Sequence, residues 1–166
     1  FLLPMKKIHP TAIIEDGADI GSDVKIGPYW HVGSDVKIGD SCELKSHVII
    51  DGQTIIGEEN IFFPTSYIGG EPQDLKYGNE KSQVKIGKKN TFREGVSVHR
   101  GTHGGGGETV IGNENLLMGY VHIAHDCHIG NNNILANYTG LSGHVKLNNH
   151  VTLGGQNGVA QFLNVG

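Results

Sequence analysis

The sequence has few cysteines, few charged residues and no long apolar run, and each shortage excludes a class of protein. Its two cysteines, Cys42 and Cys127, form neither a disulfide framework nor a CxxC pair, which favours a cytoplasmic protein. No apolar run approaches the roughly 20 residues that span a bilayer, so we expect no membrane insertion. The formal net charge of -4 gives no basic excess, which argues against nucleic acid as a partner.

A chain of 166 residues is long enough for one domain with a sizeable core. It opens with FLLPMKKIHP, in which no charged segment precedes the short apolar run, so it does not match a secretory signal. We interpret residues 1–4 as a non-native or disordered leader and expect residues 5–166 to form the domain.

Glycine, in contrast, is abundant, with 26 residues, roughly twice the usual ~7%. Valine, isoleucine and leucine are abundant too, which argues against a disordered glycine-rich chain. Together these features favour a repeat with many tight turns.

Aliphatic or phenylalanine side chains recur every six residues, and glycine often follows them. One series runs from Ile8 to Ile68, a second from Ile86 to Val98, and a third from Ile111 to Val165. A period of six fits neither a helix nor a plain alternating strand, but it fits a short strand followed by a corner. Three such hexads make a triangular coil of 18 residues, whose inward side chains stack ~4.8 Å above those of the previous coil.

This hexapeptide pattern resembles the left-handed parallel β-helix of bacterial acyltransferases, which implies an all-β solenoid. The left hand is taken from the resemblance, because general crossover rules favour the right hand.

Two segments break the repeat: GGEPQDLKYGNEKSQ, at 69–83, and HRGTHGGGGET, at 99–109. The step from Ile68 to Ile86 is itself 18 residues, so we expect the register to continue across the first segment. The step from Val98 to Ile111 is 13 residues, so a loop must intrude there. The glycine run in the second segment lacks a following GKS or GKT and is therefore no P-loop.

The stretch GYVHIAHDCHIGN contains three histidines at intervals of three residues. The 18-residue period predicts that Gly143 lies beside His125 and that His144 lies beside Asp126. A histidine there could act as a general base for acyl transfer, since its pKa lies near the working pH. The backbone N–H of Gly143 could then stabilise the oxyanion, because glycine permits close approach.

Two other interpretations compete for the histidines. The γ-class carbonic anhydrases use this solenoid to bind zinc, but their ligand histidines have a different spacing, so we expect no metal site. Isolated histidines at solenoid corners are solvated, and we interpret five of them in this way: His9, His31, His47, His128 and His150.

The pieces PQDLKY, HRGT and HIAHDC, with GNN, ILAN and GHV after them, resemble the UDP-N-acetylglucosamine acyltransferase family. The resemblance implies transfer of a 3-hydroxyacyl chain from acyl carrier protein to the 3-hydroxyl of UDP-N-acetylglucosamine, the first step of lipid A synthesis. It also implies a cytoplasmic homotrimer that uses no metal or organic cofactor, with active sites in the clefts between subunits.

By that resemblance His125 is the general base, Asp126 its electrostatic partner and Gly143 the oxyanion donor. Lys76 would meet a substrate phosphate and Asp74 a substrate hydroxyl. Six further residues would line the substrate sites: Gln73, His99, His122, Asn137, His144 and Gln161.

The chain departs from the family in two places. Ala160 stands where the family has a histidine, and the family's helical C-terminal domain is expected to be absent after Gly166. These departures keep open an inactive or binding-only solenoid fragment. An N-acyltransferase of the same pathway is a further alternative, although that family has an N-terminal uridine-binding domain and lacks the QDLKY and HRGT loops.

Overall fold

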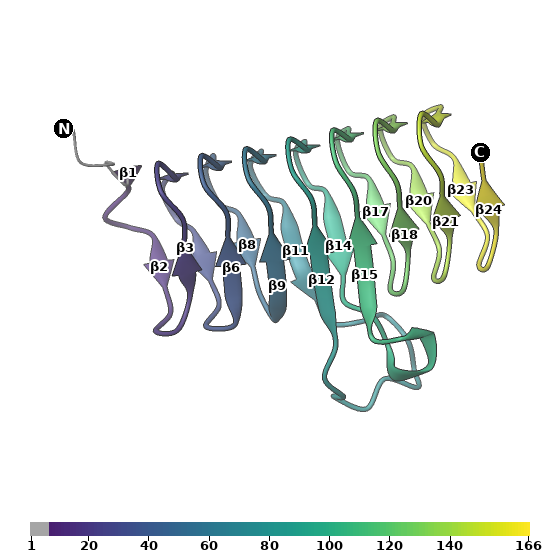
Figure 1. Cartoon of the computed structure of the whole chain (residues 1–166), viewed down its shortest axis with the longest axis horizontal. Coiled ribbons are helices and arrows are strands. Elements are labelled where there is room, and N and C mark those ends of the chain that lie inside the picture. The colour runs from purple at the N-terminus through teal and green to yellow at the C-terminus, as the bar shows by residue number, and fades with distance from the viewer. Residues whose placement is uncertain (1–6) are drawn as a thin grey trace.

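The computed structural model describes residues 7–166, so the predicted leader at 1–4 lies outside the described residues. The chain folds as a left-handed parallel β-helix whose coils advance along one axis toward the C-terminus (Figure 1). Among the described residues the one helical element is a short 3₁₀ turn, η1 (His103–Gly105). The predicted all-β solenoid is therefore confirmed.

Three parallel sheets of eight strands form the three walls of the prism. Sheet A contains β1 (Lys7–Ile8), β4 (Lys25–Ile26), β7 (Glu43–Leu44), β10 (Ile61–Phe62), β13 (Thr91–Phe92), β16 (Leu116–Leu117), β19 (Ile134–Leu135) and β22 (Thr152–Leu153). Sheet B contains β2 (Ile13–Ile14), β5 (His31–Val32), β8 (Ile49–Ile50), β11 (Tyr67–Gly70), β14 (Ser97–His99), β17 (His122–Ile123), β20 (Gly140–Leu141) and β23 (Gly158–Val159). Sheet C contains β3 (Asp19–Ile20), β6 (Val36–Ile38), β9 (Gln53–Ile56), β12 (Gln83–Ile86), β15 (Glu108–Ile111), β18 (His128–Ile129), β21 (Lys146–Leu147) and β24 (Asn164–Val165).

The core is the column of inward side chains that the sixfold pattern predicts. In a strand of two residues one side chain faces inward and the other outward, so Ile123 is fully buried while its neighbour His122 lines the outer surface. Consecutive coils stack equivalent residues, as Phe62 does on Phe92 with ring centroids 4.7 Å apart. Each fully buried aliphatic or aromatic side chain contributes roughly 1.5–3 kcal/mol, and this repeated burial holds the coils together.

A ladder of buried asparagines supports one corner of the prism. The side-chain amide of Asn90 donates to Oδ1 of Asn60, and that of Asn115 donates to Oδ1 of Asn90, each at 2.9 Å. The same amides also donate to backbone carbonyls, so polar groups buried inside the corner are largely satisfied.

The other corners turn through residues in the left-handed region of backbone space. Tyr120 and Tyr138 have φ of 60° and 62° after sheet A, and Asp126 and His144 have φ of 60° and 64° after sheet B. This conformation costs a non-glycine residue roughly 1–2 kcal/mol. It points the corner side chains outward, and the Tyr120 ring stacks on its equivalent Tyr138 in the next coil.

Two insertions leave the prism at the edge between sheets B and C, next to β12 and β15 (Figure 1). Insertion 1 comprises residues 71–82 and insertion 2 comprises residues 100–107. They contact each other, since the N–H of His103 donates to the Glu80 carboxylate at 3.1 Å.

The predicted register across the first insertion was wrong. Ile86 pairs with Ile56 in sheet C, whereas Ile68 pairs with Val98 in sheet B. The insertion therefore adds residues inside a single coil, and the 18-residue step from Ile68 to Ile86 does not stack the two. The later step of 13 residues behaves as predicted, because Ile111 pairs with Ile86 across the second insertion.

Candidate active site

A hollow of about 340 Å³ lies on the outer side of sheet B, where insertion 1 approaches it. We call it the histidine hollow. Its wall includes six of the residues predicted from the sequence: Gln73, His99, His122, His125, Gly143 and Gln161. The predicted cluster on β17 and its neighbours in later coils therefore share one cavity.

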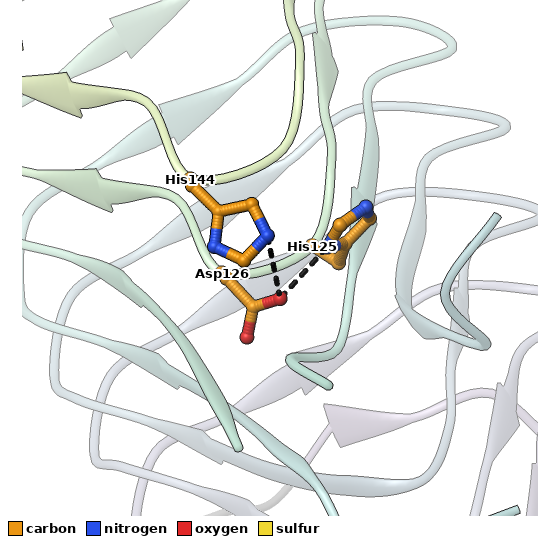
Figure 2. A group of neighbouring side chains, drawn as sticks. All are labelled: His125, Asp126 and His144. Atoms are coloured by element: carbon orange, nitrogen blue, oxygen red, sulfur yellow. Dashed lines mark hydrogen bonds and ion pairs between the residues drawn. The ribbon is translucent and has the colours of Figure 1, made fainter. Parts of the chain in front are cut away.

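His125 and Asp126 form a buried pair at the edge of this hollow (Figure 2). The Nδ1 atom of His125 lies 2.7 Å from Oδ2 of Asp126, and the two side chains are 6% and 0% exposed. An ionised carboxylate only accepts hydrogen bonds, so Nδ1 carries the proton and donates it. With the proton on Nδ1, Nε2 is the nitrogen that can accept a proton, as a general base requires.

Insertion 2 holds the Asp126 carboxylate in place. The backbone N–H of Thr102 donates to Oδ1 at 2.8 Å, and the Thr102 hydroxyl donates to Oδ2 at 2.7 Å. A β-carbon at Gly105 would lie 2.0 Å from the carboxyl carbon, so only glycine fits there. Neither Thr102 nor Gly105 could be assigned from the repeat, because insertion 2 does not follow it.

Gly143 lies against the His125 ring, as the 18-residue period predicted. A β-carbon at Gly143 would come within 2.5 Å of Cε1 and 2.7 Å of Nε2 of that ring. Among residues 7–166 no acceptor takes a hydrogen bond from the Gly143 N–H, although the residue is buried. An unpaired buried N–H close to a histidine nitrogen is suited to bind a developing oxyanion.

His144 lies one coil after Asp126, also as predicted. Its Nε2 atom is 3.8 Å from Asp126 Oδ2, so both histidines face the same carboxylate (Figure 2). The His144 ring packs edge-on to His125 and stacks on Phe162 at 4.5 Å. Phe162 was not selected from the sequence, yet it has φ of 64° and occupies the equivalent corner position one coil later.

His144 does not line the histidine hollow but a neighbouring one of about 420 Å³. Asp74 and Lys76 of insertion 1 line this neighbouring hollow too. The Lys76 N–H donates to the Asp74 carboxylate at 2.9 Å, which fixes the turn that presents both side chains. The predicted residues therefore divide between two adjoining hollows that meet around His125 and His144.

His122 and His99 form a second histidine pair inside the histidine hollow. Their ring centroids are 5.1 Å apart, and His122 Nδ1 lies 2.8 Å from the Ser97 hydroxyl. Burial lowers the pKa of His122, and the neighbouring His99 and His125 rings lower this pKa further. His122 is thus kept neutral, and Ser97 fixes its ring. The sequence did not indicate Ser97.

Two predicted features lie apart from these hollows. Asn137 is exposed at the corner after sheet A and lines neither hollow. Only the resemblance assigned it to the substrate sites. Ala160, which the resemblance sets against a histidine of the family, is exposed and follows Val159, which pairs with Leu141. Ala160 therefore stacks above Ser142 and offers no hydrogen-bonding side chain to the wall.

The cysteines are packing residues. Cys42 and Cys127 are fully buried and unpaired, and burial raises the pKa of each thiol to about 11. Both thiols are therefore protonated at neutral pH and are poor nucleophiles. His128, three residues after His125, is exposed on sheet C, in keeping with its interpretation as a solvated histidine.

Three of the site's groups could in principle hold a metal ion. One ligand atom from each of His125, Asp126 and His144 lies within 4.8 Å of the others. The contacts favour the general-base interpretation, because the carboxylate already accepts three hydrogen bonds, two from Thr102 and one from His125. A metal at this position would displace the His125 proton that those contacts hold.

No helix among residues 7–166 is long and apolar enough to cross a membrane.

Comparison with known proteins finds the same repeat and fold. The bacterial transferase hexapeptide family matches residues 17–52 and 108–143. An acyl-[acyl-carrier-protein]–UDP-N-acetylglucosamine O-acyltransferase from Rickettsia canadensis is 53% identical over 120 residues, which are 72% of this chain and 46% of that protein. The chain thus spans about half the length of the curated relatives it matches.

Solved structures agree with this similarity. The UDP-N-acetylglucosamine O-acyltransferase from Moraxella catarrhalis superimposes with a TM-score of 0.94 and 49% identity, over 96% of this chain and 62% of that one. The corresponding acyltransferase from Arabidopsis superimposes with a TM-score of 0.79 and 36% identity, over 96% of this chain and 63% of that one.

Proposed function

Since the chain belongs to the UDP-N-acetylglucosamine O-acyltransferase family, we propose that it transfers an acyl group from acyl carrier protein to UDP-N-acetylglucosamine. The acyl group is a 3-hydroxyacyl chain, the acceptor is the sugar 3-hydroxyl, and the product enters lipid A synthesis. The observation that carries the proposal is the buried His125–Asp126 pair beside the unpaired N–H of Gly143.

His125 is the general base in this reaction. Its unprotonated Nε2 removes the proton of the sugar hydroxyl as that oxygen attacks the thioester carbonyl, so the new C–O bond forms while Nε2 gains a proton. The ring then carries a positive charge, which the Asp126 carboxylate at 2.7 Å stabilises. A positioned general base of this kind contributes typically ~10²–10⁴-fold in rate.

Gly143 supplies the oxyanion donor. As the carbonyl carbon becomes tetrahedral, its oxygen gains negative charge and accepts a hydrogen bond from the Gly143 N–H. Collapse of this intermediate re-forms the carbonyl and breaks the C–S bond. The protonated His125 returns its proton to the sulfur, which leaves as the thiol of the carrier protein, and the base is regenerated.

The two adjoining hollows would hold the substrates. Lys76, with its positive charge, would meet a phosphate of the sugar nucleotide, and Asp74 would accept a hydrogen bond from a substrate hydroxyl. Five further residues on these hollows would line the path of the substrates: Gln73, His99, His122, His144 and Gln161. Asn137, which lines neither hollow, is assigned to the substrates by the resemblance alone. His122, held neutral, offers Nε2–H to the substrate once the Ser97 hydroxyl occupies Nδ1.

Assembly, location and cofactors complete the proposal. We infer a cytoplasmic homotrimer in which neighbouring subunits close the clefts over the hollows, with no cofactor. Gln73 and Lys76 are exposed in the single chain, so a neighbouring subunit could cover them.

The decisive experiment supplies this chain with 3-hydroxyacyl carrier protein and two acceptors, UDP-N-acetylglucosamine and its 3-amino analogue. Ester formation on the first supports the proposal, and exclusive amide formation on the second identifies an N-acyltransferase. Binding of UDP-N-acetylglucosamine without any product identifies a binding-only solenoid. Activity should be unchanged after treatment with a metal chelator, whereas its loss and recovery with zinc would assign His125, Asp126 and His144 to a metal.

A further inference from the structure

A third hollow, of about 560 Å³, lies over the outer side of sheet C, on the opposite side of insertion 1 from the histidine hollow. We call it the basic hollow. Lys37 of β6 and Arg100 line this hollow, together with five residues of insertion 1: Tyr77, Asn79, Glu80, Lys81 and Ser82. The proposed reaction uses none of these side chains.

Three cations in the basic hollow have no carboxylate partner. Among residues 7–166, Lys37, Lys81 and Arg100 form no ion pair. Two carboxylates, from Asp35 and Glu80, line the same hollow. The Glu80 carboxylate accepts hydrogen bonds from two backbone N–H groups, which lower its pKa and favour its charged form. The hollow therefore holds three cations against two carboxylates.

Two hydrogen bonds hold the Arg100 guanidinium in place and leave its other N–H donors available. Its Nη1 donates to the Gly69 carbonyl at 2.7 Å, and its Nη2 donates to the Tyr77 hydroxyl at 3.1 Å. A guanidinium has five N–H donors, so three stay available, and its planar fork matches the oxygens of a phosphate. Ser82 adds a buried hydroxyl on the same wall with no hydrogen-bond partner among the described residues.

We propose that the basic hollow is a second binding site, which takes a small phosphate-bearing molecule. Arg100 provides the fixed donors, Lys37 and Lys81 provide the charge, and Ser82 provides a neutral hydrogen bond. The site is separate from the phosphate contact proposed for Lys76, which lines the hollow on the other side of the insertion.

The basic hollow is connected to the histidine hollow through insertion 1. Gln73, near the start of the insertion, lines the histidine hollow, whereas Tyr77 and Lys81, in its second half, line the basic hollow. Arg100 bonds to Tyr77 and directly follows His99, whose side chain lines the histidine hollow. A phosphate on Arg100 therefore restrains the segment that presents Gln73 to the histidines.

Inorganic pyrophosphate is the probe, and its binding to this chain is measured by calorimetry at low ionic strength, where exposed charges are least screened. The test variant is the double change Lys37→Gln with Lys81→Gln, which removes two exposed cations and no observed contact. Lys146→Gln is the matched control, since Lys146 is exposed on the same sheet and, among residues 7–166, forms no ion pair, but does not line the hollow. Lys76→Gln removes the cation on the catalytic side.

We expect saturable binding by the unchanged chain, by Lys146→Gln and by Lys76→Gln, and affinity about tenfold weaker in the double variant. In the same three binding proteins, pyrophosphate should slow hydrogen exchange of the amides in residues 71–82. Absence of saturable binding would overturn the proposal, as would binding that Lys76→Gln abolishes and the double variant retains. Neither readout uses turnover, so the outcome is independent of whether the chain transfers acyl groups.

Discussion

Two corners of the same β-helix share a backbone conformation but differ in the burial of their side chains. At the corner after sheet A, Tyr120 stacks on Tyr138 with ring centroids 5.1 Å apart, and both side chains are exposed. At the corner after sheet B, Asp126 and His144 take the same left-handed conformation, but insertion 2 covers Asp126 and buries its carboxylate. The repeat creates rows of side chains, and the interruption of the repeat turns one row into a site.

The largest expected difference between the two corners is in the rate of acyl transfer after the buried carboxylate is removed. Asp126→Ala removes the group that holds the His125 proton on Nδ1, so acyl transfer should fall by roughly 10²–10⁴-fold in a steady-state assay. It also leaves the Thr102 donors unpaired, which should lower the free energy of unfolding by about 1–3 kcal/mol.

The matched change at the other corner is Tyr138→Ala. It removes only an exposed aromatic stack, worth about 0.5–1.5 kcal/mol of stability, and should leave transfer unaltered. Comparable losses of turnover in Asp126→Ala and Tyr138→Ala would show that the two corners do not differ in function.

A methyl group at Gly143 should have the next largest effect. In Gly143→Ala the new β-carbon would lie 2.5 Å from His125 Cε1, so the ring must move. A displacement of about 1 Å costs on the order of 10²-fold in rate, although the backbone N–H is still present. Gly140→Ala controls for the effect of an added methyl group on stability, because its β-carbon would meet nothing within 4 Å. Equal transfer rates in Gly143→Ala and the unchanged chain would argue against the proposed position of the base.

Thr102→Val tests the contribution of insertion 2 more gently. It removes the hydroxyl that donates to Asp126 Oδ2 and keeps the backbone N–H that donates to Oδ1. We expect kcat to fall about tenfold with KM for the sugar nucleotide unchanged, since a single hydrogen bond to a charged group is worth about 1.5–3 kcal/mol. Thr91→Val, on the outer face of sheet A, is the control and should change neither constant.

The smallest effect concerns the pH dependence of stability at His122. Its pKa is lowered in the folded chain, so the folded state binds fewer protons than the unfolded state once the pH falls below about 6.5. The contribution of His122 to the free energy of unfolding should therefore be complete above that pH and should decline as the pH falls from about 6.5 through the lowered pKa. His122→Gln should flatten this acid-side decline in denaturant titrations, and a slope equal to that of the unchanged chain would contradict the assignment.

The sixfold spacing predicted the fold and a large part of the site. Because coils stack every 18 residues after Ile111, the contacts of Gly143 with His125 and of His144 with Asp126 followed from arithmetic on the sequence. The same arithmetic failed across insertion 1, where Ile86 stacks on Ile56 and not on Ile68.

Residues in the insertions could not be placed in this way. Thr102, Gly105 and Arg100 depend on how irregular loops fold over the prism, and no period relates them to the histidines. Lys76 was identified only through a family resemblance, since a lysine in a loop carries no signal of its own. Ser97 was overlooked although it lies in the repeat: it pairs with His122 across β14 and β17, in a register that insertion 2 hides from the sequence.

The most direct test of the central claim compares two histidines three residues apart, one at the covered corner and one on the open face of sheet C. Transfer from 3-hydroxyacyl carrier protein to UDP-N-acetylglucosamine is measured for His125→Ala and His128→Ala, with the oligomeric state of each variant recorded. The account predicts that His125→Ala abolishes turnover without changing the assembly and that His128→Ala keeps the activity of the unchanged chain. Retained turnover in His125→Ala would contradict the account, as would loss of its assembly, which would make His125 a structural residue.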